Sequence, residues 1–136
     1  MLRPHASQQG VELVVEVPDA LPPVLVDPDA LVQVVMNLVD NAVKFGGPGT
    51  VRVVAEPEGP GVRLVVRDGG PGVPRSQLGQ IFDPFYRGER ELTRTTKGTG
   101  IGLSLVRGRV QHMGGTVQAR NHPEGGFEVA LHLRPA

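Results

Sequence analysis

The chain has 136 residues, which suits one folded domain, and we expect that domain to span 1–136. Its 14 Lys and Arg residues balance 14 Asp and Glu, so no basic excess indicates a nucleic-acid or anionic-membrane partner. Cysteine is absent, which excludes disulfides and thiolate metal sites, and no apolar stretch approaches the ~18 residues of a membrane span.

The first half of the chain predicts three strands and one long helix. Asp27-Pro28 combines an N-cap residue with proline at the first helical position, which predicts a helix from there to about Phe45. Glycines at 46 and 47 and Pro48 end this helix. Three short runs rich in β-branched residues are expected to be strands: 11–17, 50–56 and 62–67.

The second half predicts two loops, a second helix and two more strands. A glycine-dense loop covers 68–74, a short helical turn is expected within 78–85, and the polar, aperiodic stretch 87–97 predicts a mobile loop. The second helix is expected from about Thr99 to Met113, where Gly114 and Gly115 stop it. The last two strands are expected at 116–120 and 127–133. This count indicates an α/β layered domain with helices on one face of a sheet.

The first helix carries a narrow polar stripe of one glutamine, two asparagines and a lysine: Gln33, Asn37, Asn41 and Lys44. At ~100° per residue these side chains align, with apolar residues on both sides of them. A solvent-exposed stripe is the ordinary interpretation. Asparagine is a poor helix former, however, so two of them within one helix favour the alternative that the stripe faces a ligand cavity.

Two glycine-bearing segments could bind a nucleotide. Asp68-Gly69-Gly70-Pro71-Gly72 follows a strand, and a carboxylate there could accept a hydrogen bond from an exocyclic amine. A plain surface turn is the alternative. The segment 98–103, GTGIGL, opens the second helix, where free N–H groups and the helix dipole favour an anion. Neither segment is specific when taken alone.

The order of four segments is specific: NLVDNAVKF at 37–45, DGGPG at 68–72, IFDPFYRG at 81–88 and GTGIGLSLV at 98–106. They resemble the N, G1, F and G2 boxes of the catalytic ATP-binding domain of sensor histidine kinases, relatives of gyrase and MutL-type ATPases. The likeness extends from Val11 to Leu133. It implies a Bergerat-type fold, a two-layer α/β (α+β) sandwich in which about three helices cover a mixed, mostly antiparallel sheet of about five strands.

The resemblance implies roles for side chains at the phosphate end of ATP. Asn41 would coordinate the Mg²⁺ that bridges the phosphates, and Asn37 would lie near the same phosphates. Lys44 would supply positive charge, and Arg87 would contact the γ-phosphate from a lid formed by 84–97. Asn37, Lys44 and Arg87 are therefore the candidate catalytic residues.

The resemblance also implies the contacts to adenine and to the backbone-bound phosphates. Phe45 would pack against adenine, and Asp68 would accept from its amino group and so select adenine over guanine. Gly70 and Gly72 would let the backbone approach the base, while Gly100 and Gly102 would direct N–H groups to the phosphates. The remaining implied ATP-binding residues are Lys97, Gly98, Thr99, Ile101 and Leu103.

Two positions depart from related patterns. Gly69 stands where the family usually has Asn, which predicts a more flexible loop with adenine selection retained by Asp68. Asn37 stands where hydrolysing relatives have a Glu that activates water. An amide cannot act as a general base, so transfer of the phosphoryl group to another protein is favoured over hydrolysis.

The reaction that the resemblance implies is phosphoryl transfer from Mg-ATP to a histidine. None of His5, His112, His122 and His132 has the sequence context that the family phosphorylates. We therefore expect a fragment that cannot autophosphorylate without a separate dimerising helical hairpin bearing the acceptor. A response regulator would be the indirect partner, with no nucleic-acid or membrane contact by this domain. The location would be cytoplasmic, in a parent protein that could be anchored in the inner membrane.

Two other functions stay open at this point. A stand-alone serine kinase of the anti-sigma-factor type would explain the missing acceptor, but that group typically has Glu at the position of Asn37 and lacks the FDPFYRG box. A catalytically silent nucleotide-binding module is the second alternative. Since function depends on the site and not on the fold, only phosphotransfer itself would exclude it.

Overall fold

The computed structural model describes residues 10–46, 49–82 and 102–136. Two α-helices are present in this part of the chain: α2 (Pro28–Phe45) and α4 (Gly102–His112). A single turn of 3-10 helix, η1, covers Arg75–Gln77. The five strands are β1 (Val11–Glu16), β2 (Gly49–Glu58), β3 (Gly61–Arg67), β4 (Thr116–Asn121) and β5 (Phe127–Leu133).

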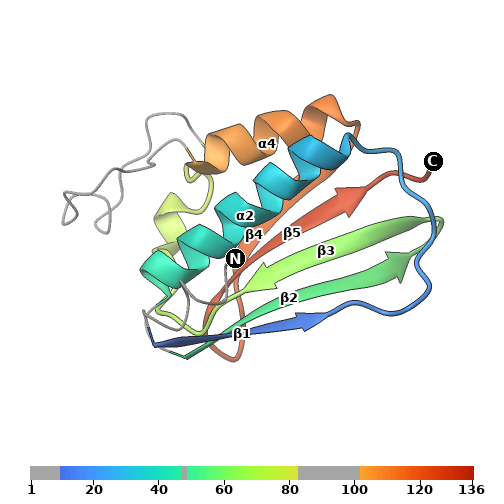
Figure 1. The fold of residues 1–136 in the computed structure, drawn as a ribbon. Helices are drawn as coiled ribbons and strands as arrows, with labels where there is room; N and C mark the ends of the chain where they lie inside the picture. Colours follow the sequence, from blue (N-terminus) through green and yellow to red (C-terminus); the bar gives the residue numbers. More distant parts are fainter. Residues whose placement is uncertain (1–9, 47–48, 83–101) are drawn as a thin grey trace.

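The strands form one mixed sheet in the order β1-β2-β3-β5-β4. The edge strand β1 is parallel to β2, and the other three pairings are antiparallel. Figure 1 shows α2 and α4 side by side across one face of this sheet. The predicted two-layer architecture and the mostly antiparallel sheet of five strands are therefore confirmed.

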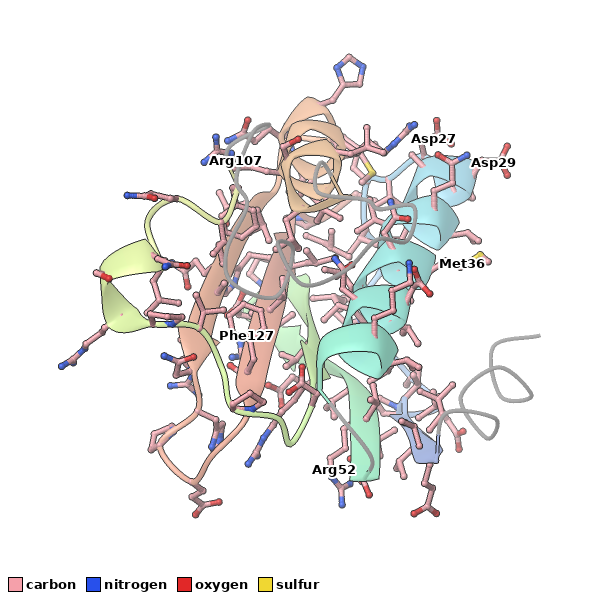
Figure 2. The ribbon with its side chains drawn as sticks, turned by 90° about the vertical axis from the view of Figure 1, so that its left-hand side faces the viewer. Asp27, Asp29, Met36, Arg52, Arg107 and Phe127 are labelled. Carbon is pink, nitrogen blue, oxygen red and sulfur yellow. The ribbon has the colours of Figure 1, made fainter. Side chains whose placement is uncertain are left out.

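Helix α2 begins and ends where the sequence predicts. Asp27 caps its first turn, since one carboxylate oxygen accepts from the backbone N of Asp29 at 3.1 Å and of Ala30 at 3.4 Å. Figure 2 shows the two aspartates together at the start of the helix. At the other end, the N–H of Gly46 donates to the Ala42 carbonyl oxygen at 2.9 Å.

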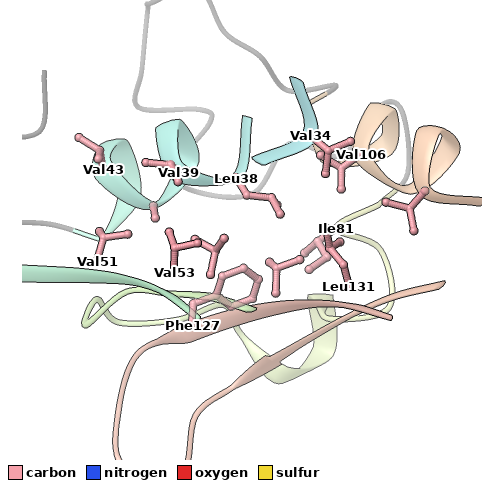
Figure 3. Close-up of a cluster of buried hydrophobic side chains, with 14 of the residues drawn as sticks. Val34, Leu38, Val39, Val43, Val51, Val53, Ile81, Val106, Phe127 and Leu131 are labelled. Atoms are coloured by element: carbon pink, nitrogen blue, oxygen red, sulfur yellow. The ribbon is translucent and has the colours of Figure 1, made fainter. Parts of the chain in front are cut away.

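An aliphatic core lies between the helix layer and the sheet (Figure 3). Val34 of α2, Val106 of α4 and Leu131 of β5 are each 0% exposed. The composition predicts this kind of core, because only 4% of the residues are aromatic. Of the aromatic side chains in the described part, Phe82 and Phe127 belong to the core as well. Burial at this density makes the helix layer and the sheet one packing unit.

In the described ranges, the opposite face of the sheet carries charge pairs and no helix. Glu128 of β5 accepts from Arg63 at 3.3 Å and from Arg120 at 2.9 Å, and Arg63 also reaches Glu56 at 3.1 Å. The registers place these residues on neighbouring strands. Antiparallel sheets tolerate one solvated face in this way, so a second layer is not required.

Three expectations need correction or fall outside the described part. About three helices were expected, and the described residues contain two α-helices plus the 3-10 turn. The expected helical turn in 78–85 is displaced, because the 3-10 helix precedes it at Arg75–Gln77 and simple turns follow to Phe82. The predicted mobile loop 87–97 lies outside the described residues. No helix in the described ranges is long and apolar enough to cross a membrane.

Replacing Val34 by Ala should destabilise the chain, and the same change at Val32 should not. Val34 is 0% exposed, whereas Val32, two residues away on the same helix, is 56% exposed. We expect Val34→Ala to cost about 2 kcal/mol of unfolding free energy from lost burial and a residual cavity. Val32→Ala should stay within about 0.5 kcal/mol. Urea unfolding monitored by circular dichroism measures both, and equal losses would contradict the assigned helix orientation.

Candidate functional site

Three predicted segments meet at one end of the molecule. Figure 1 shows the C-terminal end of α2, the N-terminal end of α4 and the end of β3 on the same side, because α2 and α4 run in opposite directions. The loop that carries Asp68 leaves β3 at that end. Binding of one ligand by all three segments stays a prediction.

Asp68 is a buried carboxylate in a fixed position. Only 4% of the residue is exposed. Its Oδ1 accepts hydrogen bonds from the backbone N of Gly70 at 2.8 Å and of Phe127 at 3.4 Å. Its own backbone N donates to the Phe127 carbonyl oxygen at 3.0 Å. Hydrogen-bonded burial of this kind holds the direction of the carboxylate without assistance from a ligand.

Two glycines let the end of α2 touch the loop after β3. A Cβ on Gly46 would lie 2.7 Å from the Asp68 Cβ, and a Cβ on Gly70 would lie 2.7 Å from the Gly46 Cα. Real Cβ atoms essentially never approach so closely. The helix terminus and the loop can therefore meet only where both residues lack a side chain. This protein-to-protein contact gives Gly70 a structural role of its own, and its approach to a base stays a prediction.

The solvent exposure of the polar stripe differs along α2. Gln33 is exposed, whereas Asn37 and Asn41 are half-buried. The apolar residues beside the stripe also differ in burial. Val39 and Val43 are buried, but Val32 is exposed and Figure 2 shows Met36 directed away from the sheet. The solvent-exposed interpretation therefore fits the beginning of the stripe. The half-buried amides lie toward the end that meets the Asp68 loop.

Lys44 makes an ion pair within its own helix. Its Nζ is 3.0 Å from Asp40 Oδ2, with about a third of each side chain exposed (27% and 35%). Exposed i,i+4 pairs contribute only about 0.3–0.5 kcal/mol. The ammonium group is therefore held loosely enough to be redirected toward a phosphate.

The remaining predicted site residues are described only in part. Gly102 is the first residue of α4, and Leu103 is half-buried against the core. The side chain of Phe45 is not described. The residues Arg87, Lys97, Gly98, Thr99, Gly100 and Ile101 lie outside the described ranges, so their roles remain predictions.

Across the described residues, no group of three or more His, Cys, Asp and Glu side chains could hold a metal ion. An ion such as Mg²⁺ often keeps several waters and binds one or two protein oxygens together with substrate phosphates. The half-buried amide of Asn41 fits that minimal contribution.

Sequence reasoning missed the contribution of Phe127 to the site. Its backbone N–H and C=O both bind Asp68, across 59 residues of sequence. A backbone group carries no residue-specific signal, so no motif could have indicated this pair. Only the β3–β5 register, in which Arg67 pairs with Glu128, brings the two residues together.

A groove of about 660 Å³ runs along α4 beside the beginning of α2. It is formed by the beginning of α2 and by α4, and its lining consists of Asp27, Ala30, Ser104, Leu105, Gly108, Arg109, His112 and Met113. Of the described residues that line it, none is a predicted site residue.

Comparison with known proteins agrees with the geometry. Residues 26–136 match the family described as "Histidine kinase-, DNA gyrase B-, and HSP90-like ATPase". The chain belongs to this family.

Its curated relatives are sensor kinases. The chain is 36% identical over 129 residues to the sensor histidine kinase ZraS of Escherichia coli, covering 94% of this chain and 26% of the relative. It is 40% identical over 128 residues to the sensor protein KdpD of Mycobacterium tuberculosis, and the match covers 93% of this chain and 14% of KdpD. The chain thus spans about a quarter or less of the length of these relatives.

Solved structures give the same result. The mycobacterial sensor histidine kinase MprB superposes with a TM-score of 0.80 at 29% identity, covering 99% of this chain and 92% of that one. Full-length ShkA in complex with AMPPNP superposes with a TM-score of 0.81 at 32% identity, and the match covers 99% of this chain and 28% of ShkA. The predicted resemblance to the catalytic ATP-binding domain of sensor histidine kinases is confirmed.

Replacing Gly69 by Ala should stabilise the loop, whereas Gly70→Ala should destabilise it. A Cβ on Gly69 meets nothing within 4 Å, and its φ lies outside the left-handed region. Gly69→Ala should therefore add about 0.4–1 kcal/mol by restricting the unfolded chain. Gly70→Ala would force a Cβ against Gly46 and should cost about 1–3 kcal/mol. Thermal unfolding of both variants measures this, and a loss of stability in Gly69→Ala would contradict the open surroundings of that residue.

Proposed function

We propose that the chain is the catalytic domain of a two-component sensor histidine kinase, which binds Mg-ATP and donates the γ-phosphoryl group to a histidine on a separate domain. The observation that carries the proposal is the buried, backbone-held carboxylate of Asp68 beside the end of α2. Family membership and the AMPPNP complex of ShkA support a nucleotide as the ligand.

Asp68 would select adenine by accepting a hydrogen bond from its exocyclic amino group. An ionised carboxylate offers about four lone-pair sites. Gly70 and Phe127 hold Oδ1 in place, and a carboxylate is the kind of acceptor that an exocyclic amino group requires. Guanine presents a carbonyl oxygen where adenine has its amino group, and a buried carboxylate facing that oxygen would be left unsatisfied. Such a mismatch gives strong discrimination between bases.

The phosphates would lie between the end of α2 and the beginning of α4. Asn41 would bind Mg²⁺ together with phosphate oxygens, with Asn37 nearby on the same stripe. Lys44 would leave Asp40 to neutralise phosphate charge. Arg87, Gly98 and Gly100 would complete the site from the segment outside the described residues, and Gly102 from the start of α4. Charge neutralisation and positioning of this kind are the main requirements of phosphoryl transfer.

The phosphate acceptor would belong to another domain. His132 is paired with Glu58 at 2.8 Å on the helix-free face, and His112 is an exposed residue at the end of α4. Neither lies at the end of the molecule that holds Asp68. We infer that the acceptor histidine lies on a dimerising helical hairpin of the parent protein, that a response regulator receives the phosphate, and that the reaction occurs in the cytoplasm. We also propose that residues 1–136 form a single domain.

Replacing Asp68 by Ala should abolish selective adenine-nucleotide binding. Calorimetric titration of the 136-residue chain with Mg²⁺ and AMPPNP should show saturable binding, with a much weaker response to the guanine analogue. Asp68→Ala should lose at least tenfold in AMPPNP affinity, since a hydrogen bond to a charged group contributes about 1.5–3 kcal/mol. Asp29→Ala, an exposed carboxylate at the far end of α2, is the control and should bind as the wild type does.

Failure of the folded wild type to bind any nucleotide would refute the proposed function. If nucleotide binds but no phosphate reaches an acceptor hairpin supplied in solution, the silent-module alternative would replace the kinase. A stand-alone serine kinase would be indicated only by transfer to a serine of a partner protein.

Asn41→Asp should weaken the Mg²⁺-dependent part of nucleotide binding. The change adds a negative charge beside the phosphates and alters the metal ligand, so we expect AMPPNP affinity in Mg²⁺ to fall about tenfold or more. Gln33→Glu adds the same charge to the exposed beginning of the stripe and serves as the control. Titrations with and without Mg²⁺ measure the effect. Equal affinities for Asn41→Asp and wild type in both buffers would exclude the metal role.

A further inference from the structure

Asn121, the last residue of β4, contacts the Asp68 loop with both ends of its side-chain amide. Its Oδ1 accepts a hydrogen bond from the backbone N of Val73 at 2.9 Å, and its Nδ2 donates one to the Val73 carbonyl oxygen at 2.8 Å. The amide thus pairs with Val73 much as a neighbouring strand would, across 48 residues of sequence. A two-point contact fixes both the position and the orientation of the loop backbone.

Gly72 provides the space that the Asn121 amide occupies. Its φ is +79°, and a Cβ built there would lie 2.3 Å from Asn121 Oδ1. Any other residue at 72 would be strained in its backbone and would also collide with the amide. The position of the Asn121 amide therefore requires glycine at position 72.

The other end of the same loop is held by the register partner of Asn121. Asn121 pairs with Phe127 between β4 and β5, and Phe127 binds Asp68 through both of its backbone groups. The turn between the strands is closed by the N–H of His122, which donates to the Gly126 carbonyl oxygen at 2.8 Å. The β4–β5 hairpin therefore binds the loop at two positions, Asp68 and Val73.

We propose that Asn121 is a positioning residue for adenine recognition, which acts by holding the loop 68–73 in its binding conformation. This inference rests on the proposed ATP-binding function. Asn121 does not need to touch the base. It orders the loop before the nucleotide arrives, so that binding does not have to supply the conformational entropy of ordering it. Without Asn121, Asp68 would keep its chemistry but lose its fixed direction.

The test compares adenine and guanine nucleotides on Asn121 variants of the 136-residue chain. Asn121→Ala should reduce the affinity for Mg-AMPPNP about tenfold and should lower the ratio of adenine to guanine affinity. Asn121→Asp keeps an acceptor for the Val73 N–H and loses the donor, so its ratio should be intermediate. Gln118→Ala, an exposed change on the same strand, is the control. A merely destabilised fold would lower the binding-competent fraction for both nucleotides alike and leave their ratio unchanged.

A double-mutant cycle tests the match between Gly72 and Asn121. Gly72→Ala should reduce the affinity ratio strongly in the wild type, since the new Cβ displaces the amide. In the Asn121→Ala background, where that collision is absent, the same change should have a smaller effect. Strictly additive effects would show that the two residues act separately and would overturn the proposed clamp.

Amide hydrogen exchange without nucleotide separates this inference from the proposed function. The Gly70 N–H, which binds Asp68 and does not contact Asn121, should exchange faster in Asn121→Ala than in the wild type. If the wild type binds nucleotide, the positioning role alone would be overturned by either of two results. One is equal Gly70 exchange in Asn121→Ala and the wild type, and the other is an equal ratio of adenine to guanine affinity in the two proteins. If the wild type binds neither nucleotide, the proposed function fails and the role in adenine recognition fails with it.

Discussion

The site depends on a contact between two glycines, Gly46 at the end of α2 and Gly70 in the loop after β3. Side chains at either position would separate the helix from the loop, because each added Cβ would lie within 2.8 Å of the other segment. Because neither position has a side chain, the end of α2 can lie against the loop that carries the buried carboxylate of Asp68. The core beneath supports this contact, since Val39 and Val43 anchor the last turns of α2 on the sheet.

The fold was largely predictable because its local signals agree with its global arrangement. The Asp27-Pro28 start and the glycine end of α2 coincide with observed caps, and the β-branched runs coincide with strands. The 3-10 turn at Arg75–Gln77 was not predicted, because the segment has neither a clear period nor a capping signal. The resemblance implied a mixed sheet but did not identify its parallel pair, β1 with β2, since single strands do not reveal their partners.

Of the candidate site, only side chains could be proposed from the sequence. Residue type and order indicated Asp68, Asn37 and Asn41, and their roles stay predictions. The partners that hold the Asp68 loop could not be predicted. Phe127 contributes backbone groups, and Asn121 contributes an amide from a strand far along the chain, so both depend on the order β3-β5-β4 in the sheet. Polar stripes are also ambiguous, as the exposed Gln33 and half-buried Asn41 on one stripe demonstrate.

The strand order has a consequence for how the protein is made. All four motif segments have been synthesised once the ribosome has passed residue 106, yet the brace on Asp68 comes from Phe127 and the grip on Val73 comes from Asn121. A nascent chain that ends before β5 would therefore carry every recognisable motif and still lack the strand whose backbone binds Asp68. Under the proposed function, nucleotide binding would follow closure of the β4–β5 hairpin.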